Sequence, residues 1–251
     1  MTRVMLMRID VITLFPEMFE GPFNSSILKR AREQGKVQIN IINLRDYSQD
    51  KHKQVDDYSY GGGKGMVIKP EPVFRAVEAV VKERSKAGVV LLCPQGQLFD
   101  QDKAKKMAEI NHLVLICGHY EAIDERVKEN LIDEQISIGD YVLTGGEIPA
   151  MVVTDSVVRL LPGVLSSPES VEEESFYQGL LEHPHYTRPE DFRGLKVPEI
   201  LLSGDHEKIR LWRRQQSLAR TLNKRPDLLS KTSLNKEDKK IIQELLPDEK
   251  Q

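Results

Sequence analysis

The chain has 251 residues, of which 39% are apolar and 30% are charged, and its formal net charge is −3. This length suits one large or two small domains with the composition of an ordinary soluble protein. No apolar run approaches the ~20 residues that a membrane-spanning helix needs, so we expect no membrane partner. Its two cysteines, Cys93 and Cys117, lack metal-type spacing, which favours reduced thiols in a cytoplasmic protein.

The first part of the chain alternates candidate strands with candidate helices. Residues 8–15 and 37–44 carry apolar side chains at roughly alternate positions, which predicts strands. Residues 89–93, 112–117 and 135–138 are apolar runs that predict three more. Helices are expected between and after them, with the following starts or caps: Ser25 or Ser26, Pro72, Asp100, Asp124, and Glu147 with Pro149. Apolar strands alternating with helices predict an α/β fold with a mostly parallel sheet covered on both faces.

Turn-forming segments follow the three later strands: Pro94-Gln95-Gly96, Gly118-His119-Tyr120-Glu121, and Gly139-Asp140-Tyr141. The carboxyl ends of parallel strands meet at one edge of a sheet, and ligands bind there. Beyond the third segment, Gly145 and Gly146 allow the backbone to approach a ligand closely. The sequence shows no Ser/His/Asp set, metal-ligand spacing or dinucleotide fingerprint. We therefore expect a pocket for a ligand that brings its own chemistry.

Residues 45–65 show almost no core pattern and end in Tyr60-Gly61-Gly62-Gly63-Lys64-Gly65. A segment this long is rarely idle in a compact domain. It is either a flexible solvated loop or a substrate-contacting loop, in which backbone amides and Lys51, Lys53 and Lys64 would meet phosphates. A nucleotide hydrolase is disfavoured, because Gly65 stands where a Walker A loop needs Ser or Thr.

The composition changes after the helix that begins at Glu147. Residues 160–182 contain glutamates but no Lys or Arg, which is typical of a linker. His183-Pro184-His185-Tyr186 is interpreted as a rigid turn and not as a metal site, since it lacks suitably spaced Cys or carboxylate partners. Residues 228–251 predict a short, charged helical tail.

A long helix is predicted from His206. Residues 208–225 contain no Asp or Glu, and spacings of three and four place a set of side chains on one helix face: Arg210, Arg213, Arg214, Ser217 and Arg220. A solvated face usually mixes charges, so this face predicts a phosphate-binding surface for nucleic acid. Trp212 suits either a core position or a stacking platform.

Several segments in fixed order resemble the bacterial tRNA (guanine-37-N1)-methyltransferases, from Met7 to about Leu229. They are Leu14-Phe15-Pro16-Glu17-Met18-Phe19, Tyr60-Gly61-Gly62-Gly63, Pro94-Gln95-Gly96, Tyr120-Glu121 with Ile123-Asp124-Glu125-Arg126, Ile138-Gly139-Asp140-Tyr141-Val142-Leu143, and His183-Pro184-His185-Tyr186-Thr187-Arg188-Pro189. Six segments in one order make the resemblance specific.

The resemblance implies that residues 1–165 form a SPOUT-type α/β methyltransferase domain, whose C-terminal part is threaded as a trefoil knot that binds the cofactor. It further implies a flexible linker at 166–180 and a small helical tRNA-binding domain at 181–251. Members of the family are homodimers with active sites shared between subunits. The implied cofactor is S-adenosylmethionine, and the substrate is tRNA with guanine at position 37, which becomes N1-methylguanosine and supports reading-frame maintenance. A Mg²⁺ dependence belongs to the family, but no motif for it is present and no metal ligand is assigned.

The resemblance also implies residue roles. Arg159 would stabilise charge on guanine O6, and Glu174 would act as the general base on N1. The cofactor contacts would be Leu92, Cys93, Pro94, Gln95, Gly96, Gly118, Tyr120, Glu121, Ile138, Gly139, Asp140, Tyr141, Val142, Leu143, Gly145, Gly146 and Pro149. The tRNA contacts would be Lys51, Asp56, His185, Arg188, Arg210, Arg213, Arg214 and Arg220.

The chain departs from the family pattern at the base. The family has acid-Asp-Ser-Phe, whereas this chain has Glu173-Glu174-Ser175-Phe176, which moves the carboxylate by one methylene. Errors on the order of 1 Å can cost ~100-fold in rate. We expect Glu174 to remain the base, with Glu173 as the alternative. The milder departures are His119, Ala122 and Cys93, where the family commonly has Arg, Gly and Ser.

Two other functions stay open from the sequence. One is a knotted enzyme that acts on a different RNA base, which Arg159, Glu174 and the basic helix disfavour. The other is a non-catalytic RNA-binding module, in which Glu174 would have inactivated the enzyme.

Overall fold

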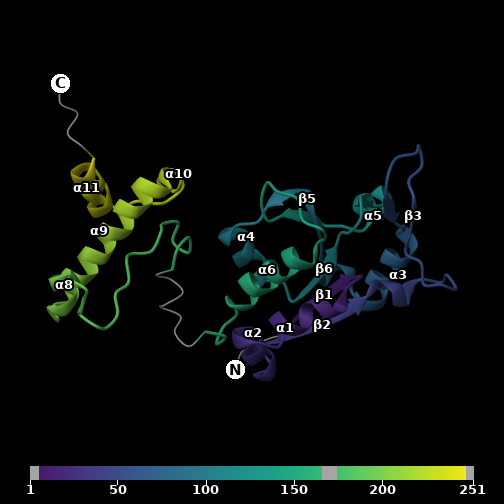
Figure 1. Cartoon of the computed structure of the whole chain (residues 1–251), viewed down its shortest axis with the longest axis horizontal. Helices are drawn as coiled ribbons and strands as arrows, with labels where there is room; N and C mark the ends of the chain where they lie inside the picture. Colours follow the sequence, from purple (N-terminus) through teal and green to yellow (C-terminus); the bar gives the residue numbers. More distant parts are fainter. Residues whose placement is uncertain (1–5, 166–173, 247–251) are drawn as a thin grey trace. The chain divides into compact units, whose positions relative to one another are not determined.

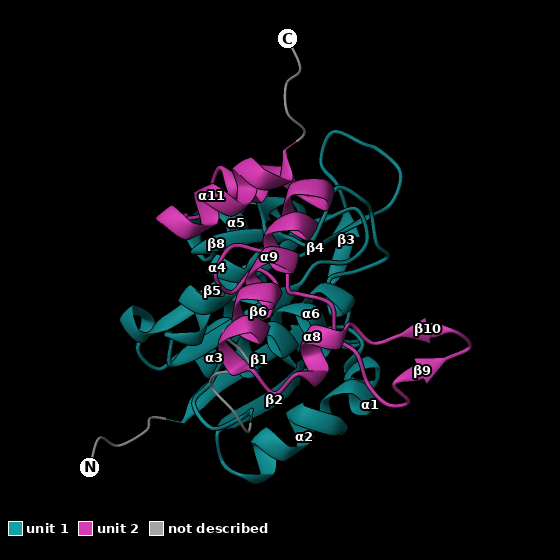
Figure 2. Ribbon diagram, turned by 90° about the vertical axis from the view of Figure 1, so that its left-hand side faces the viewer, with its two compact units in different colours: residues 1–166 teal, residues 167–251 magenta. Residues whose placement is uncertain are grey.

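The computed structural model describes residues 6–165 and 174–246. The chain divides into two compact units, residues 1–166 and 167–251 (Figure 2). Each unit has its own buried apolar core. The sites below are therefore built within one unit at a time.

The first unit is organised around a five-stranded sheet in the order β2-β1-β6-β5-β8, in which every pairing is parallel. Its strands are β1 (Met7–Thr13), β2 (Val37–Asn43), β5 (Ala87–Leu98), β6 (His112–Cys117) and β8 (Glu134–Ser137). The predicted α/β fold with a mostly parallel central sheet is confirmed.

Helices cover both faces of this sheet (Figure 1). One face packs against α1 (Glu20–Phe23), α2 (Ser26–Glu33), α4 (Gln101–Ala108) and α6 (Glu147–Val158), and the other against α3 (Pro70–Val80) and α5 (Glu125–Asn130). Val11 and Leu115 belong to the first core, while their neighbours Ile12 and Ile116 belong to the second. Successive side chains of a strand point to opposite faces, so a strand buried on both sides is apolar throughout.

A smaller three-stranded sheet contains β3 (Asp56–Tyr58), β4 (Met66–Ile68) and β7 (Ala122–Ile123). β3 and β4 form an antiparallel hairpin, and β4 pairs in parallel with β7. Val55, just before β3, is fully buried in the second core. The interpretation of residues 45–65 as a wholly flexible loop is therefore wrong. One buried valine among polar residues produces no periodic apolar pattern in the sequence, yet it helps to anchor the segment in the core.

Helix starts follow local capping chemistry. The Oδ1 atoms of Asp100 and Asp124 accept hydrogen bonds from the backbone N–H groups of Lys103 and Arg126, as predicted. Ser25 precedes α2, but its hydroxyl donates to the Gly21 carbonyl and does not cap the helix. α3 begins at Pro70, before the predicted Pro72, because either proline suits a first turn. Single-turn 3₁₀ helices lie at η1 (Pro16–Phe19), η2 (Leu44–Tyr47) and η3 (Arg84–Lys86).

The second unit contains α8 (Glu199–Leu202), α9 (His206–Lys224), α10 (Pro226–Leu229), α11 (Lys236–Leu245) and a ribbon of β9 (Asp191–Phe192) with β10 (Leu195–Lys196). Leu180, Leu218 and Ile241 form its buried core. The helix predicted within residues 228–251 is present as α11, which a capping box of Asn235 and Asp238 starts. It is not a detached tail, because Ile241 packs it into that core. No helix in the described ranges is both long and apolar enough to cross a membrane.

Candidate active site

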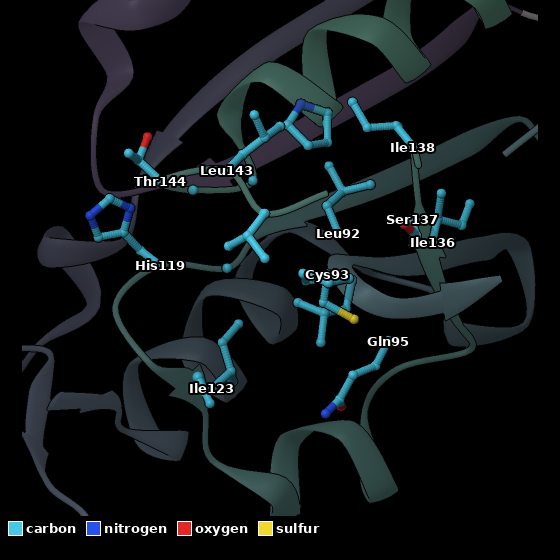
Figure 3. A pocket seen from close by; sticks show the side chains of 18 of the residues that line it. Leu92, Cys93, Gln95, His119, Ile123, Ile136, Ser137, Ile138, Leu143 and Thr144 are labelled. Atoms are coloured by element: carbon cyan, nitrogen blue, oxygen red, sulfur yellow. The ribbon is translucent and has the colours of Figure 1, made fainter. Parts of the chain in front are cut away.

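A cavity of about 290 Å³ lies at the carboxyl ends of β5, β6 and β8. Figure 3 shows Leu92 and Cys93 of β5 at its centre, with Ile136 and Ser137 of β8 on one side and His119 on the other. These strands are neighbours in the order β6-β5-β8, so their ends converge. The structure thus brings together the three segments that the sequence singled out.

Most residues expected to hold the cofactor line this cavity: Leu92, Cys93, Pro94, Gln95, Gly118, Tyr120, Glu121, Ile138, Gly139, Tyr141, Val142, Leu143, Gly145, Gly146 and Pro149. Gly96 and Asp140 are not among the lining residues. The lining also includes residues that were not assigned as cofactor contacts from the sequence, and most of them flank assigned ones: Leu91, His119, Ala122, Ile123, Lys128, Ile136, Ser137 and Thr144.

The sequence predicts that the strand at 89–93 ends before Pro94, but β5 continues beyond this point. Leu92 and Gln97 both pair with Ile136 of β8, so residues 93–96 loop out of the ladder and the strand then continues to Leu98. A Cβ on Gly96 would lie 2.3 Å from the Ile136 nitrogen. Gly96 thus provides the close crossing of β8, and the bulge turns the Cys93–Gln95 region toward the cavity.

The segment between β6 and β7 forms a second wall. Tyr120 adopts φ 58°, which strains a residue with a Cβ. Such strain costs on the order of 1–3 kcal/mol and clusters at functional sites. The Glu121 N–H donates to the Met66 carbonyl, and a Cβ on Gly65 would lie 2.4 Å from Glu121 Cγ. This wall is therefore tied to the β3–β4 hairpin.

Gly145 and Gly146 bring the chain from β8 back against the end of β6. The Gly146 N–H donates to the Gly118 carbonyl at 2.8 Å, and His119 pairs with Gly145 in an isolated antiparallel bridge. A Cβ on Gly146 would lie 2.7 Å from Cys117 Cα. Glycine is required here because the obstacle is backbone.

Behind this wall, Glu147 is only 2% exposed. Its Oε1 accepts a hydrogen bond from the Thr13 hydroxyl at 2.8 Å, and its place in the first turn of α6 favours a negative charge. Burial raises the pKa of the Cys117 thiol well above its ordinary value of 9.0, and the Glu147 charge adds to this. The sequence marked Glu147 only as a helix start, since burial cannot be read from a short motif.

The two residues expected to act on guanine are not among this cavity's lining residues. Arg159 is the half-buried C-cap of α6. With a helical rise of ~1.5 Å per residue, it lies roughly 15 Å along the helix axis from Pro149. Glu174 belongs to the second unit and is half-buried, and Glu173 lies outside the described residues.

The predicted basic face of α9 is only partly present. Arg213 is exposed, and Arg210 pairs with Glu207 in the helix's first turn. Arg214 instead forms a bidentate pair with Asp238 of α11, with N···O distances of 2.7 and 2.8 Å. This pair lowers the pKa of Asp238 and raises that of Arg214.

Ser217 is also buried, where it donates to the Leu181 carbonyl. The prediction of one exposed face is therefore wrong at Arg214 and Ser217. Helical spacing alone does not say which side of the helix the core occupies. Arg220 is half-buried.

The remaining expected tRNA contacts are spread over both units. Lys51 is exposed and Asp56 is half-buried near the hairpin, while His185 and Arg188 are exposed in the second unit. The His185 ring lies 3.7 Å from the Glu182 carboxylate. Within residues 6–165 and 174–246, no group of three or more His, Cys, Asp or Glu side chains could hold a metal ion.

Comparison with known proteins connects this geometry to a family. The profile described as tRNA (Guanine-1)-methyltransferase TrmD matches residues 7–231. A tRNA (guanine-N(1)-)-methyltransferase from Pelotomaculum thermopropionicum is 62% identical over 242 residues, covering 96% of each chain. A protein of the same name from Dictyoglomus turgidum is 60% identical over 240 residues, which cover 96% of this chain and 97% of the relative. Another from Bacillus cereus is 58% identical over 240 residues, which cover 95% of this chain and 98% of the relative. The chain belongs to the tRNA (guanine-1)-methyltransferase family.

Proposed function

We propose that the protein transfers the methyl group of S-adenosylmethionine to N1 of guanine at position 37 of tRNA, next to the anticodon. The observation that supports this proposal most strongly is the cavity at the ends of β5, β6 and β8. It occurs in a chain whose relatives are named tRNA (guanine-N(1)-)-methyltransferases. The product is N1-methylguanosine, which supports reading-frame maintenance. A tRNA substrate places the reaction in the cytoplasm.

The residues of this cavity, called the cofactor cavity from here on, suit this cofactor. Leu92, Ile136 and Leu143 offer apolar surface for the adenine, and the backbone of residues 138–143 offers it hydrogen-bonding groups. Glu121 adds a carboxylate suited to the cofactor's positive charge. When bound, S-adenosylmethionine supplies a methyl group on an already activated sulfonium. The chain's own task is alignment, which the glycine-lined walls serve by admitting the ligand close to the backbone.

Glu174 and Arg159 act on the guanine. Guanine N1 carries a proton and is a poor nucleophile until that proton leaves. Glu174 accepts it as general base, a role typically worth ~10²–10⁴-fold. Negative charge then spreads to guanine O6, where the Arg159 guanidinium stabilises it.

A homodimer with shared active sites explains how these residues meet a cofactor. Arg159 lies roughly 15 Å along α6 from the cavity residue Pro149, which suits a contribution to a second subunit's cavity. α6 is apolar on nearly every side, a pattern of buried helices, yet Ile148 is 45% and Val152 39% exposed. A second copy of the chain would cover this surface.

The proposal includes the family's trefoil knot in the cofactor-binding part of the first unit. The support is the close passage of chain segments that are distant in sequence. Gly146 lies against Cys117 and Gly118, and Gly96 lies against Gln135 and Ile136. Backbone contacts of this kind are expected where one loop passes another.

The C-terminal helical unit is proposed to grip the tRNA, with the 166–180 linker joining it to the methyltransferase domain. Arg213 and Arg220 on α9 support this role, together with exposed Arg188. Arginine side chains suit the phosphate backbone.

Transfer of labelled methyl groups tests the proposal. The full chain is incubated with labelled S-adenosylmethionine and tRNA transcripts that carry G or A at position 37. We expect label only in the G transcript, recovered as N1-methylguanosine after digestion and mass spectrometry. Transfer to the A transcript would indicate another target base, and transfer to neither would favour a binding module.

A further inference from the structure

Glu147 and His119 face each other across Gly145, at the edge of the cofactor cavity. A Cβ on Gly145 would press on Glu147 Oε2 and would lie 2.6 Å from His119 Nδ1, so both atoms border one small space that only glycine leaves open. His119 and Gly145 line the cofactor cavity, whereas the buried Glu147 lies behind its wall. Figure 3 shows His119 on the same side of the cavity as Thr144, which precedes Gly145. The proposed reaction assigns no role to Glu147 or His119.

The Glu147 carboxylate is fixed from the side of β1. Its Oε1 accepts the hydrogen bond of the Thr13 hydroxyl at 2.8 Å, and Thr13 Oγ1 in turn accepts from the Phe15 N–H at 2.9 Å. Thr13 and Glu147 are both buried, so this link is shielded from solvent. An ionised carboxylate only accepts hydrogen bonds, and each of its oxygens offers about two lone pairs. Oε2 can therefore accept a hydrogen bond from the Gly145 side.

The His119 ring is held in place but lacks one hydrogen bond. Its centroid lies 4.8 Å from the ring centroids of both Phe15 and Tyr120. Among the residues that the structure describes, no group bonds to His119 Nδ1, although this nitrogen is buried. A buried polar atom without a partner is destabilising. Because the two neighbouring rings limit rotation of the imidazole, a partner for Nδ1 has to lie in the space beside Gly145.

A single water molecule suits this space. No direct hydrogen bond joins His119 Nδ1 to Glu147 Oε2. Two hydrogen bonds of ~2.8 Å through one water would span the gap, since both atoms border the same point. Buried waters commonly link polar groups that would otherwise lack a partner. The negative charge of Glu147 favours the His119 tautomer with its proton on Nδ1, because that proton is then nearer to the carboxylate.

His119 begins the strained wall of the cofactor cavity. It forms a bridge with Gly145, and the next residue, Tyr120, adopts φ 58°. Strained backbone persists only where its surroundings hold it. Tyr120 packs edge-on against the His119 ring, and Glu121, which follows, offers the carboxylate suited to the cofactor's positive charge. The orientation of His119 therefore affects the positions of Tyr120 and Glu121.

We propose that Glu147 is a positioning residue of the cofactor site. Through one buried water it accepts a hydrogen bond from the His119 Nδ1–H group, and this link holds the wall from His119 to Glu121 in the form that receives the cofactor. This role rests on the proposed function, which makes the wall a cofactor contact. Glu174 remains the general base, and Glu147 takes no part in the proton transfer.

Nitrogen-15 NMR of the histidine rings tests the hydrogen bond without any cofactor. The full chain has six histidines, and the signals lost in His119→Asn identify those of His119. We expect the neutral His119 ring of the unmodified protein to carry its proton on Nδ1. In Glu147→Gln this preference should be lost, because the amide has no charge and can donate as well as accept. A merely structural role of Glu147 would leave the tautomer unchanged.

Calorimetry with S-adenosylhomocysteine tests the effect on the cofactor site. Glu147→Gln and His119→Gln should each bind about tenfold more weakly, since each removes the hydrogen bond at Nδ1. The double variant should bind no more weakly than either single variant, because both changes delete one interaction. His119→Asn should bind more tightly than His119→Gln, since the Asn amide lies where Nδ1 was and the Gln amide lies where Nε2 was. Thr154→Val, at another buried polar position of α6 outside the cavity lining, is the matched control and should bind normally.

Three results would overturn the role of Glu147. They are a His119 proton on Nε2 in the unmodified protein, additive losses in the double variant, and no advantage of His119→Asn over His119→Gln. If Glu147→Gln does not fold, the tautomer of the unmodified protein and the two His119 variants still decide the question. An unmodified chain that does not bind S-adenosylhomocysteine would instead contradict the proposed function, while the NMR measurement would still test the hydrogen bond.

Discussion

Glu174, the proposed general base, is the position at which this chain departs from the family pattern at the base. The carboxylate is retained, but its side chain is one methylene longer than aspartate. The second unit holds Glu174 half-buried, beside Ser175, whose hydroxyl accepts the Glu182 N–H. That hydrogen bond restricts the backbone on the C-terminal side of Glu174.

We expect Glu174→Gln to lower single-turnover methyl transfer by at least ~100-fold, because the amide cannot accept the N1 proton. Glu174→Asp should keep most activity, since it restores the shorter acid of the family pattern. Glu173→Gln is the control and should change the rate little. Transfer at the normal rate by Glu174→Gln would remove the general-base assignment.

The two cysteines should differ in reactivity. The pKa of Cys117 is raised by burial, so little thiolate forms, whereas Cys93 lines the cofactor cavity. Iodoacetamide at mildly alkaline pH should therefore modify Cys93 before Cys117, and S-adenosylhomocysteine should slow the modification. Peptide mass spectrometry checks this, with Cys93→Ser as control. Earlier labelling of Cys117 would contradict the burial argument.

At the scale of elements, the return of the chain from β8 to β6 depends on backbone contact. In Gly146→Ala the new Cβ would press on Cys117 Cα and the Gly118 nitrogen, so the cavity wall must shift. We expect S-adenosylhomocysteine to bind at least tenfold more weakly, as measured by calorimetry, because even a small displacement of the wall disturbs the position of the ligand. Gly21→Ala, which meets nothing within 4 Å, is the control and should bind normally.

The Arg214–Asp238 pair joins α9 to α11. Asp238 is buried, so Asp238→Asn leaves the Arg214 charge without its partner at a cost of roughly 3 kcal/mol. The folded pKa of Asp238 lies below its ordinary value of 3.8. Its stabilisation is therefore fully present above that value and is lost as the pH falls through the folded pKa.

Urea unfolding followed by Trp212 fluorescence measures this effect, since the chain's single tryptophan lies on α9. The unmodified protein should lose stability on acidification below pH 3.8 more steeply than Asp238→Asn. The double variant Arg214→Met with Asp238→Leu should recover part of the loss by removing both charges. Equal stability of Asp238→Asn and the unmodified protein would show that the pair contributes nothing.

At the scale of the whole molecule, shared sites predict complementation between two impaired chains, assayed at a low concentration of S-adenosylmethionine. Gly146→Ala damages the cofactor cavity and Glu174→Gln removes the base, so a mixed dimer would keep one site with an intact cavity and an intact Glu174. Random pairing of co-expressed chains should restore about a quarter of normal activity. Sites built within one chain would restore none, and this outcome would overturn the shared-site proposal.

Much of the first unit was predictable because its signals are local. Continuous apolar runs predicted β5, β6 and β8, and Asp100 and Asp124 marked the helices after them. The same logic predicted a pocket at the strand ends, where the structure has a cavity. It could not find the bulge in β5 or the buried Glu147, because both depend on a neighbouring strand far away in sequence.

The second unit shows the limit of helical spacing. The positions of charge along α9 were visible in the sequence. Only the structure shows that Arg214 pairs with Asp238 of α11 and that Ser217 is buried against the Leu181 carbonyl. Similarly, residues 45–65 show no repeating apolar pattern because Val55 is their one fully buried apolar residue. The spacing of side chains shows which residues share one side of a helix. The segments that pack against the helix determine what that side contacts.

The sequence by itself determined the fold class, the family and the segments that meet in the cofactor cavity, because apolar runs, caps and glycine motifs act over a few residues. Only the tertiary structure decided that Ala122 and Ile123 line two cavities, one at the strand ends and one beside the β3–β4 hairpin. It also decided that the side chains of Tyr58 and Tyr60 are exposed to solvent, and that Arg159 lies far along α6 from the cavity at the strand ends. These features depend on which segments pack together, and packing joins residues that no local pattern connects.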